Sequence, residues 1–366
     1  MSEHRKKALE RFLSLGKDSS WPEPALPGAA GVAAEGLVFV DGYFRPELST
    51  VPTGIICIPL EQALSSYGLF LKTRWAKQLP EMDFYSAANL AHHGAGVFLY
   101  VPPGVRLDAP LRIIQTLTSA HLSSPRIQLT LGKNASLSLV QTSAGQGFSN
   151  GVIDAALEAG SSFEFLDVGL DAPNRFFSLF ATLKRDATLK ALHATNGGSR
   201  FSVRAQLLEE NSSTLLRGLA MLNGTETAEF HALVEHLAPH CTSRQHVKMA
   251  LQGQSRSHFE GKIYVHPEAQ KTAAYQLNNN LLLSDKAVAQ TQPNLEIFAD
   301  DVKASHGATV AELQDEELFY LRSRGLGPEE AKLLLTEGFC REILDDVQEE
   351  KIRESLLAVM HGLHHA

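Results

Sequence analysis

Residues 132–166 read GKNASLSLVQTSAGQGFSNGVIDAALEAGSSFEFL and hold two copies of one pattern. In each copy a polar turn, GKNAS or EAGSS, leads into a short run of alternating apolar residues, LSLV or FEFL. Alternation with a period of two indicates strands that bury one face and leave the other in contact with solvent or a second layer. The repeated unit is therefore a turn followed by a strand.

The same pattern continues along the chain. Further turns start at Lys184, Glu209, Ala238 and His266, so the successive spacings are 26, 26, 25, 29 and 28 residues. A steady period in the twenties, carried by strands without helices between them, is typical of a solenoid whose units bury their apolar faces only by stacking. We predict a mainly β fold, a parallel β-helix of seven to nine coils spanning residues 91–312. An antiparallel sandwich is the alternative, since it also has evenly spaced strands.

Helical patterns flank the repeats. Residues 1–90 are predicted to form a mixed, partly helical region that begins with an amphipathic helix in which Phe12 and Leu13 share a face. Residues 313–366 are predicted to form a helical domain, with Pro328 at the first position of one helix. The chain is thus expected to have a β-helix core between two helical ends.

Composition excludes several classes of function. The formal net charge of −8 argues against sequence-independent nucleic-acid binding, which needs clustered Lys and Arg. No apolar run approaches the ~20 residues that span a bilayer, and the first residues lack the apolar core of a signal peptide. Three widely separated cysteines, Cys57, Cys241 and Cys340, form neither a disulfide framework nor a CxxC metal motif. We expect a cytoplasmic protein with neither a nucleic-acid nor a membrane partner.

The segment 292–325, QPNLEIFADDVKASHGATVAELQDEELFYLRSRG, combines three features. It opens as an alternating strand, passes a single imidazole at His306 beside Gly307, and changes to helical period between Asp315 and Gly325. Neither a nucleophile–base pair nor a pair of converging acids accompanies the imidazole. An edge strand, a lone histidine and a following helix indicate a docking surface and a protein that is not an enzyme.

Two groups of polar residues invite other interpretations. Six histidines lie between His231 and His266, but their spacing matches no compact metal motif, and their role stays open. Acidic residues are adjacent at Glu209-Glu210 and at Asp300-Asp301. Neighbouring strand residues point to opposite faces, so each pair is expected to split. This disfavours the alternative of a carbohydrate-active β-helix enzyme, which uses converging carboxylates.

Three segments near the end of the chain are distinctive: KTAAYQLNNNLLLS (271–284), LEIFADDVKASHGATV (295–310) and DEELFYLRSRGLGPEEAKLLL (315–335). Together they resemble the C-terminal signature of the SufB/SufD family of iron–sulfur cluster assembly proteins. The chain is more similar to SufD than to SufB, because SufB has a glutamate at the position of Gly307. The resemblance implies a right-handed parallel β-helix flanked by helical domains. It also implies a non-ATPase scaffold subunit that pairs with a SufB-like subunit.

The resemblance assigns roles near the end of the β-helix. His306 matches the histidine that lies at the SufB–SufD interface and is implicated in cluster assembly, so it is the predicted metal ligand. Lys303 is a predicted partner contact beside it. Ala304 stands where many relatives have cysteine, so this chain offers no thiolate there. The isolated chain is expected to bind no cofactor, whereas an iron–sulfur cluster could form at the interface with the SufB-like partner.

The resemblance also implies a second partner. The helices between Phe319 and Phe339 match those that dock a SufC-like ABC ATPase. Leu321, Arg324, Leu334 and Phe339 are the predicted contacts, although helical period equally explains the apolar ones as internal core. A third possibility is a metal-free structural homodimer, formed through exposed edge strands when the partner is missing.

Overall fold

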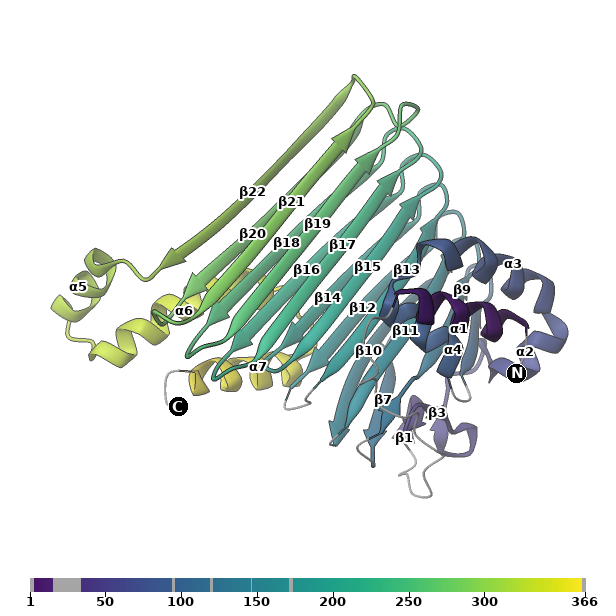
Figure 1. The fold of residues 1–366 in the computed structure, drawn as a ribbon, viewed down its shortest axis with the longest axis horizontal. Coiled ribbons are helices and arrows are strands. Elements are labelled where there is room, and N and C mark those ends of the chain that lie inside the picture. The colour runs from purple at the N-terminus through teal and green to yellow at the C-terminus, as the bar shows by residue number, and fades with distance from the viewer. Residues whose placement is uncertain are drawn as a thin grey trace.

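In the computed structural model, the described residues are 3–15, 34–93, 96–118, 121–145, 147–170 and 174–363. The chain folds into a parallel β-solenoid of about seven turns, with helices at both ends of the sequence (Figure 1). From residue 97 onward, neighbouring strands of each sheet pair in parallel, so the predicted parallel β-helix is confirmed and the antiparallel sandwich is wrong. Among the described residues, no helix combines the length and apolar character that a transmembrane span requires.

Two sheets form the walls of the solenoid, and the chain alternates between them. Sheet I contains β5 (Ile56–Pro59), β6 (Val97–Val101), β8 (Leu122–Ser123), β9 (Arg126–Leu131), β11 (Phe148–Leu157), β13 (Arg175–Leu183), β15 (Ser199–Leu207), β17 (Thr227–His236), β19 (Arg256–Val265) and β21 (Val288–Ile297). Sheet II contains β2 (Leu37–Val40), β3 (Tyr43–Phe44), β7 (Leu111–Leu117), β10 (Ser136–Gly145), β12 (Ser162–Gly169), β14 (Thr188–Thr195), β16 (Ser213–Leu222), β18 (Thr242–Leu251), β20 (Thr272–Leu282) and β22 (Val302–Glu312). A separate small pair is formed by β1 (Ala34–Glu35) and β4 (Ser49–Thr50).

The turn signals of the sequence stack at one corner of the solenoid, where strands of sheet I lead into strands of sheet II. Each turn has one residue in the left-handed backbone region, with φ between 57° and 69°: Asn134, Gly160, Asp186, Asn211, His240 and Lys271. Each donates its backbone N–H to a carbonyl of the next turn, on Ala159, Arg185, Glu210, Pro239, Gln270 and Asp301 respectively. The repeated polar turns therefore form a hydrogen-bonded column, which explains why they recur at one spacing.

Aromatic side chains stack in the interior. Phe177, Phe201, Phe230 and Phe259 are successive register partners on sheet I, and their ring centroids lie 5.9, 5.4 and 6.2 Å apart. Separations of this size are those of favourable aromatic pairs. The apolar positions predicted from strand alternation thus form one continuous core along the solenoid.

Helices pack on the outer faces of both sheets: the N-terminal helices on sheet I and two of the C-terminal helices on sheet II. The N-terminal helices are α1 (Glu3–Leu15), α2 (Leu60–Ser66), α3 (Gly68–Gln78) and α4 (Phe84–His92), with 3-10 turns η1 (Pro46–Leu48) and η2 (Leu79–Glu81). They pack with Phe98, Val152 and Phe180 on the outer face of sheet I. Phe12 is buried there, but Leu13 is 64% exposed, so the expectation that they share the packed face is wrong for Leu13.

The C-terminal helices are α5 (Asp315–Ser323), α6 (Pro328–Leu344) and α7 (Glu350–Gly362). α6 and α7 pack on the outer face of sheet II, where Cys340, Leu356 and Met360 are buried. Pro328 is the first residue of α6, as predicted. The N-terminal region also enters both sheets, because β2 pairs with β7 and β5 pairs with β6. The domain boundaries at residues 90 and 312 remain predictions.

Candidate functional site

Both sheets end in the same coil, at β21 and β22, and this end of the solenoid is open (Figure 1). β21 pairs with β19 and β22 pairs with β20, whereas no described strand pairs with the outer side of either. Such an edge presents backbone N–H and C=O groups to a further strand. Inside this coil, Leu295, Val302 and Ala304 pack against the core but remain half-buried. The last coil therefore lacks the cover that every inner coil has.

His306 lies at the mouth of the open coil. Its register partner on β20 is Gln276, whose side chain is 2% exposed and whose Nε2 donates to Oε1 of Gln245 at 2.8 Å. Register partners on adjacent strands face the same way, so His306 stands on the interior side, above Gln276. The imidazole is nevertheless exposed, because no further coil covers it. The buried Oε1 of Gln276 has no hydrogen-bond partner among the described residues.

This coil offers one imidazole and no thiol. Ala304 is on the same side of β22 as His306, two residues earlier. Burial raises the pKa of Cys57 and of Cys340 to about 12, and it also raises the pKa of Cys241. Thiolate is the form of cysteine that binds metal. Among the described residues, no thiolate accompanies His306 in this coil.

The helix that follows β22 is unusually exposed. No residue of α5 is buried, and Phe319 and Tyr320 are 74% and 57% exposed. Figure 1 shows α5 projecting beyond the ends of the strands. Adjacent exposed aromatic side chains make this helix a candidate interaction surface. The sequence analysis did not name Phe319 or Tyr320 as a partner contact. The feature that could have identified them is the presence of two aromatic residues in a helix that has no complete apolar stripe.

Four of the residues predicted to contact partners are at least partly exposed. Lys303 on β22 is exposed, and so is Arg324, whose guanidinium lies over the ring of Tyr320 at 5.3 Å. Leu321 is half-buried, and Leu334 on α6 is 47% exposed. These residues lie where a partner could reach them, but their roles remain predictions.

Phe339 differs from these residues. It is half-buried against sheet II, and its backbone oxygen accepts a hydrogen bond of 2.9 Å from Nζ of Lys248. The same ammonium lies 5.1 Å from the centroid of the phenyl ring. Phe339 therefore anchors α6 to the solenoid, and its predicted contact with the ATPase stays a prediction.

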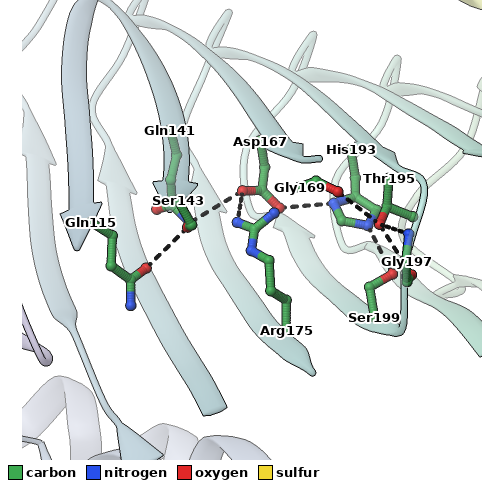
Figure 2. A network of polar contacts seen from close by, with 10 residues as sticks. All are labelled: Gln115, Gln141, Ser143, Asp167, Gly169, Arg175, His193, Thr195, Gly197 and Ser199. Atoms are coloured by element: carbon green, nitrogen blue, oxygen red, sulfur yellow. Dashed lines mark hydrogen bonds and ion pairs between the residues drawn. The ribbon is translucent and has the colours of Figure 1, made fainter. Parts of the chain in front are cut away.

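A polar network lies inside the solenoid (Figure 2). Asp167 forms an ion pair of 2.6 Å with Arg175, and its second carboxylate oxygen lies 2.8 Å from Nδ1 of His193. Gln141 donates to Asp167 at 3.1 Å. All four side chains are buried, so the network is closed to a substrate. Each charge of such a buried pair depends on its partner, because removal of one leaves the other buried without compensation.

The six histidines of the sequence do not converge on one point. His236 is buried inside the solenoid, where its Nε2 lies 2.8 Å from Oγ of Ser243. His246 lies on sheet II beside Arg217 and Asn279. His231 and His258 come together on the outer face of sheet I.

The adjacent acids are engaged locally. Glu209 accepts a hydrogen bond from the backbone N–H of Arg185, and Glu210 pairs with the Arg185 guanidinium at 2.6 Å. The expectation that this pair splits between two faces is wrong, because both residues lie in a turn and not in a strand. Carboxylates held in this way give the carbohydrate-active alternative no support.

The family of the chain follows from comparison with known proteins. Residues 113–339 match the sequence model of SUF system FeS cluster assembly, SufBD core domain. The chain belongs to the SufBD family. This SufBD chain is 38% identical over 178 residues to the iron–sulfur cluster assembly protein SufD of Escherichia coli. That match covers 48% of the chain and 42% of the E. coli protein.

Two further relatives extend the match. A SufBD family protein of Synechocystis is 28% identical over 337 residues, which cover 85% of the SufBD chain and 74% of that protein. The assembly protein SufB of Bacillus subtilis is 24% identical over 297 residues, which cover 78% of the chain and 64% of that protein. The resemblance to the SufB/SufD family, and to SufD within it, is confirmed.

Proposed function

We propose that this SufBD chain is a cytoplasmic, non-enzymatic scaffold subunit of an iron–sulfur cluster assembly complex. One observation carries the proposal: the open coil that bears His306 continues directly into the exposed helix α5, since β22 ends at Glu312 and α5 begins at Asp315. An unpaired edge, a metal-binding side chain and a docking helix thus form one continuous segment.

The first partner in this proposal is a SufB-like subunit that adds its own strands to β21 and β22. Strand addition uses the free backbone groups of the edge for affinity and side-chain pockets for specificity. It would also cover Leu295 and Val302, which the chain alone leaves half-buried. His306 would then contribute one ligand to a cluster that is the product of the complex. Partner thiolates would supply the others, because mixed histidine and cysteine ligation of iron–sulfur clusters is chemically feasible.

The second partner is a SufC-like ABC ATPase that docks on α5 and the start of α6. Phe319, Tyr320 and Leu334 present apolar surface there. Because α5 follows β22 immediately, a nucleotide-dependent movement of the ATPase would act on the strand that carries His306. This proposal therefore links ATP hydrolysis to the opening of the scaffold interface.

The test is co-expression of the chain with SufB-like and SufC-like partners, followed by anaerobic reconstitution with iron and sulfide. We expect wild type and His306→Ala to form the same complex in a pull-down, and the variant to lose most of the cluster absorbance. His121→Ala, which removes another exposed imidazole, is the matched control and is expected to keep the cluster.

Three results would count against parts of the proposal. Equal cluster absorbance in wild type and His306→Ala would give His306 an architectural role. Failure to capture either partner would remove the scaffold assignment. A stable dimer of the chain that persists in the presence of the SufB-like subunit would favour the metal-free homodimer.

A further inference from the structure

Four side chains form a checkerboard on the outer face of sheet I. Glu229 and His231 lie on β17, and His258 and Glu260 lie on β19. Glu229 is the register partner of His258, and His231 is the register partner of Glu260. Residues two apart on a strand share a face, so all four side chains point outward from the solenoid. The imidazoles occupy one diagonal and the carboxylates occupy the other.

The donor atoms of this checkerboard lie close together. One ligand atom each of Glu229, His231 and His258 lies within 4.8 Å of the others, and all three residues are half-buried. Nε2 of His231 is 3.0 Å from Oε2 of Glu229, and its Nδ1 is 3.0 Å from Oε2 of Glu260. The two imidazole rings meet edge to face, with centroids 5.3 Å apart. Small side-chain rotations would bring the three donors to one ion.

We propose that Glu229, His231 and His258 bind one divalent first-row transition-metal ion on this face. Two imidazoles and one carboxylate form a donor set that zinc and its neighbours in the transition series accept. Glu260 completes the arrangement, because metal-binding histidines generally donate their other ring N–H to a carboxylate. Its contact with Nδ1 of His231 directs Nε2 toward Glu229, so the ion would take the place of the hydrogen bond between these two residues and release its proton to solvent.

Neighbouring residues allow Glu229 to turn toward the ion. Nε of Arg200 on β15 lies 3.4 Å from Oε2 of Glu229, and this cation would compete with the metal. Arg200 also has other partners, because its Nη1 lies 2.9 Å from Asp83 and its guanidinium stacks on Tyr85 at 4.6 Å. It can therefore keep its position when Glu229 binds the ion.

The proposed ion site is separate from the open coil. It lies on the outer face of sheet I, whereas His306 lies on the interior side of sheet II. β19 is adjacent to the edge strand β21, where the register partners of His258 and Glu260 are Gln290 and Gln292. The site thus adds a second metal-binding position that does not depend on the proposed scaffold role.

The test measures direct binding to the purified chain. The C-terminal imidazoles His361, His364 and His365 are first replaced by alanine, because three imidazoles so close in sequence would compete for divalent ions. Zn²⁺ is then titrated calorimetrically, and Co²⁺ is followed by its visible absorption. We expect one ion per chain, and an affinity at least tenfold lower in Glu229→Gln, His231→Gln and His258→Gln.

Two further variants sharpen the test. Arg200→Gln removes the competing cation and is expected to tighten binding severalfold, while His121→Ala removes an unrelated exposed imidazole and should leave binding unchanged. Thermal unfolding without metal confirms that each variant is folded. Absence of stoichiometric binding, or equal binding in wild type, His231→Gln and His258→Gln, would overturn the proposal and leave the checkerboard as a proton-sharing surface cluster.

Discussion

Gln276 and His306 are register partners on adjacent parallel strands, yet the first is buried and the second is exposed. Both face the interior side of sheet II, and only the number of coils above them differs. The exposure of His306 is therefore a consequence of its place in the last coil. A partner that extends the solenoid by one strand would bury the imidazole in the position that Gln276 now has.

Hydrogen exchange should detect this extension. In the isolated chain, amides on the unpaired side of β21 and β22 are expected to exchange rapidly, because they donate to no neighbouring strand. Binding of a SufB-like partner should slow exchange at least tenfold in peptides from 288–297 and 302–312. The inner strands β12 and β14 serve as internal controls and should not change. Stable binding without protection of either edge would contradict strand addition.

Phe319 is expected to be a docking anchor for the ATPase. Its side chain is 74% exposed, so Phe319→Ser should change the free energy of unfolding by no more than about 0.5 kcal/mol. Loss of a buried aromatic anchor in the complex should weaken ATPase binding at least tenfold, measured by calorimetry. Leu69→Ser on α3 is the matched control, because Leu69 is 85% exposed at the other end of the molecule. Equal effects of the two substitutions would argue against docking on α5.

Removing one partner from the ion pair of Asp167 and Arg175 should cost much stability, because the remaining charge stays buried without its partner. Arg175→Met leaves a buried carboxylate without its main partner, and we expect a loss of about 3–5 kcal/mol in urea unfolding. Lys190→Met is the control, because it breaks the exposed pair with Glu164 and should cost less than about 1 kcal/mol. The double variant Asp167→Leu with Arg175→Met should recover most of the loss. Equal stability of both single variants would contradict this account.

The same ion pair predicts that the stability of the fold depends on pH in the acidic range. Burial alone would raise the pKa of Asp167, but the Arg175 guanidinium and the His193 imidazole outweigh it and lower the pKa. A lowered carboxyl pKa stabilises the fold above the unfolded value of about 4, and this contribution is lost as the pH falls through the folded value. The stability difference between wild type and Asp167→Asn should therefore shrink below pH 4.

His236 should make the fold sensitive to mild acid. Burial lowers its pKa to about 4, whereas an unfolded histidine titrates near 6.5. The neutral imidazole contributes fully to the free energy of unfolding above pH 6.5, and this contribution is lost as the pH falls toward 4. The loss between pH 7 and pH 5 is about 2 kcal/mol. Urea midpoints should fall over this interval more in wild type than in His236→Gln. Parallel pH profiles for the two proteins would contradict the assignment.

Two glycine-to-alanine substitutions should act in opposite directions. A Cβ at Gly261 would strike the buried amide of Gln276 and lie 2.6 Å from the ring of Phe259, so Gly261→Ala should destabilise by about 1–3 kcal/mol. A Cβ at Gly338, in α6, would meet nothing within 4 Å. Gly338→Ala should stabilise by about 0.5–1 kcal/mol, because alanine favours a helix over glycine. Thermal unfolding of the two variants measures both effects.

Much of the fold and the edge site could be predicted from local patterns. The turns beginning at Gly132 and Glu158 mark the coil length, and the alternation around Leu295 marks the edge strand. These features depend on residues close together in the sequence, where side-chain period and turn chemistry act directly. The distinction between Phe319 and Phe339 could not be predicted in this way. Phe339 is half-buried because α6 packs against sheet II, whereas Phe319 on α5 is left exposed, and this packing joins segments far apart in the sequence.

The sequence by itself determined that this chain is a stacked parallel solenoid of the SufBD family with a histidine near its last strand. Only the tertiary structure decided that Glu229, His231, His258 and Glu260 share one patch. Their meeting depends on the register between β17 and β19, in which positions 29 residues apart lie side by side. A register shifted by one residue would place the two histidines on opposite faces of the sheet. Register between distant strands depends on the packing of whole coils, which the pattern of either strand alone does not specify.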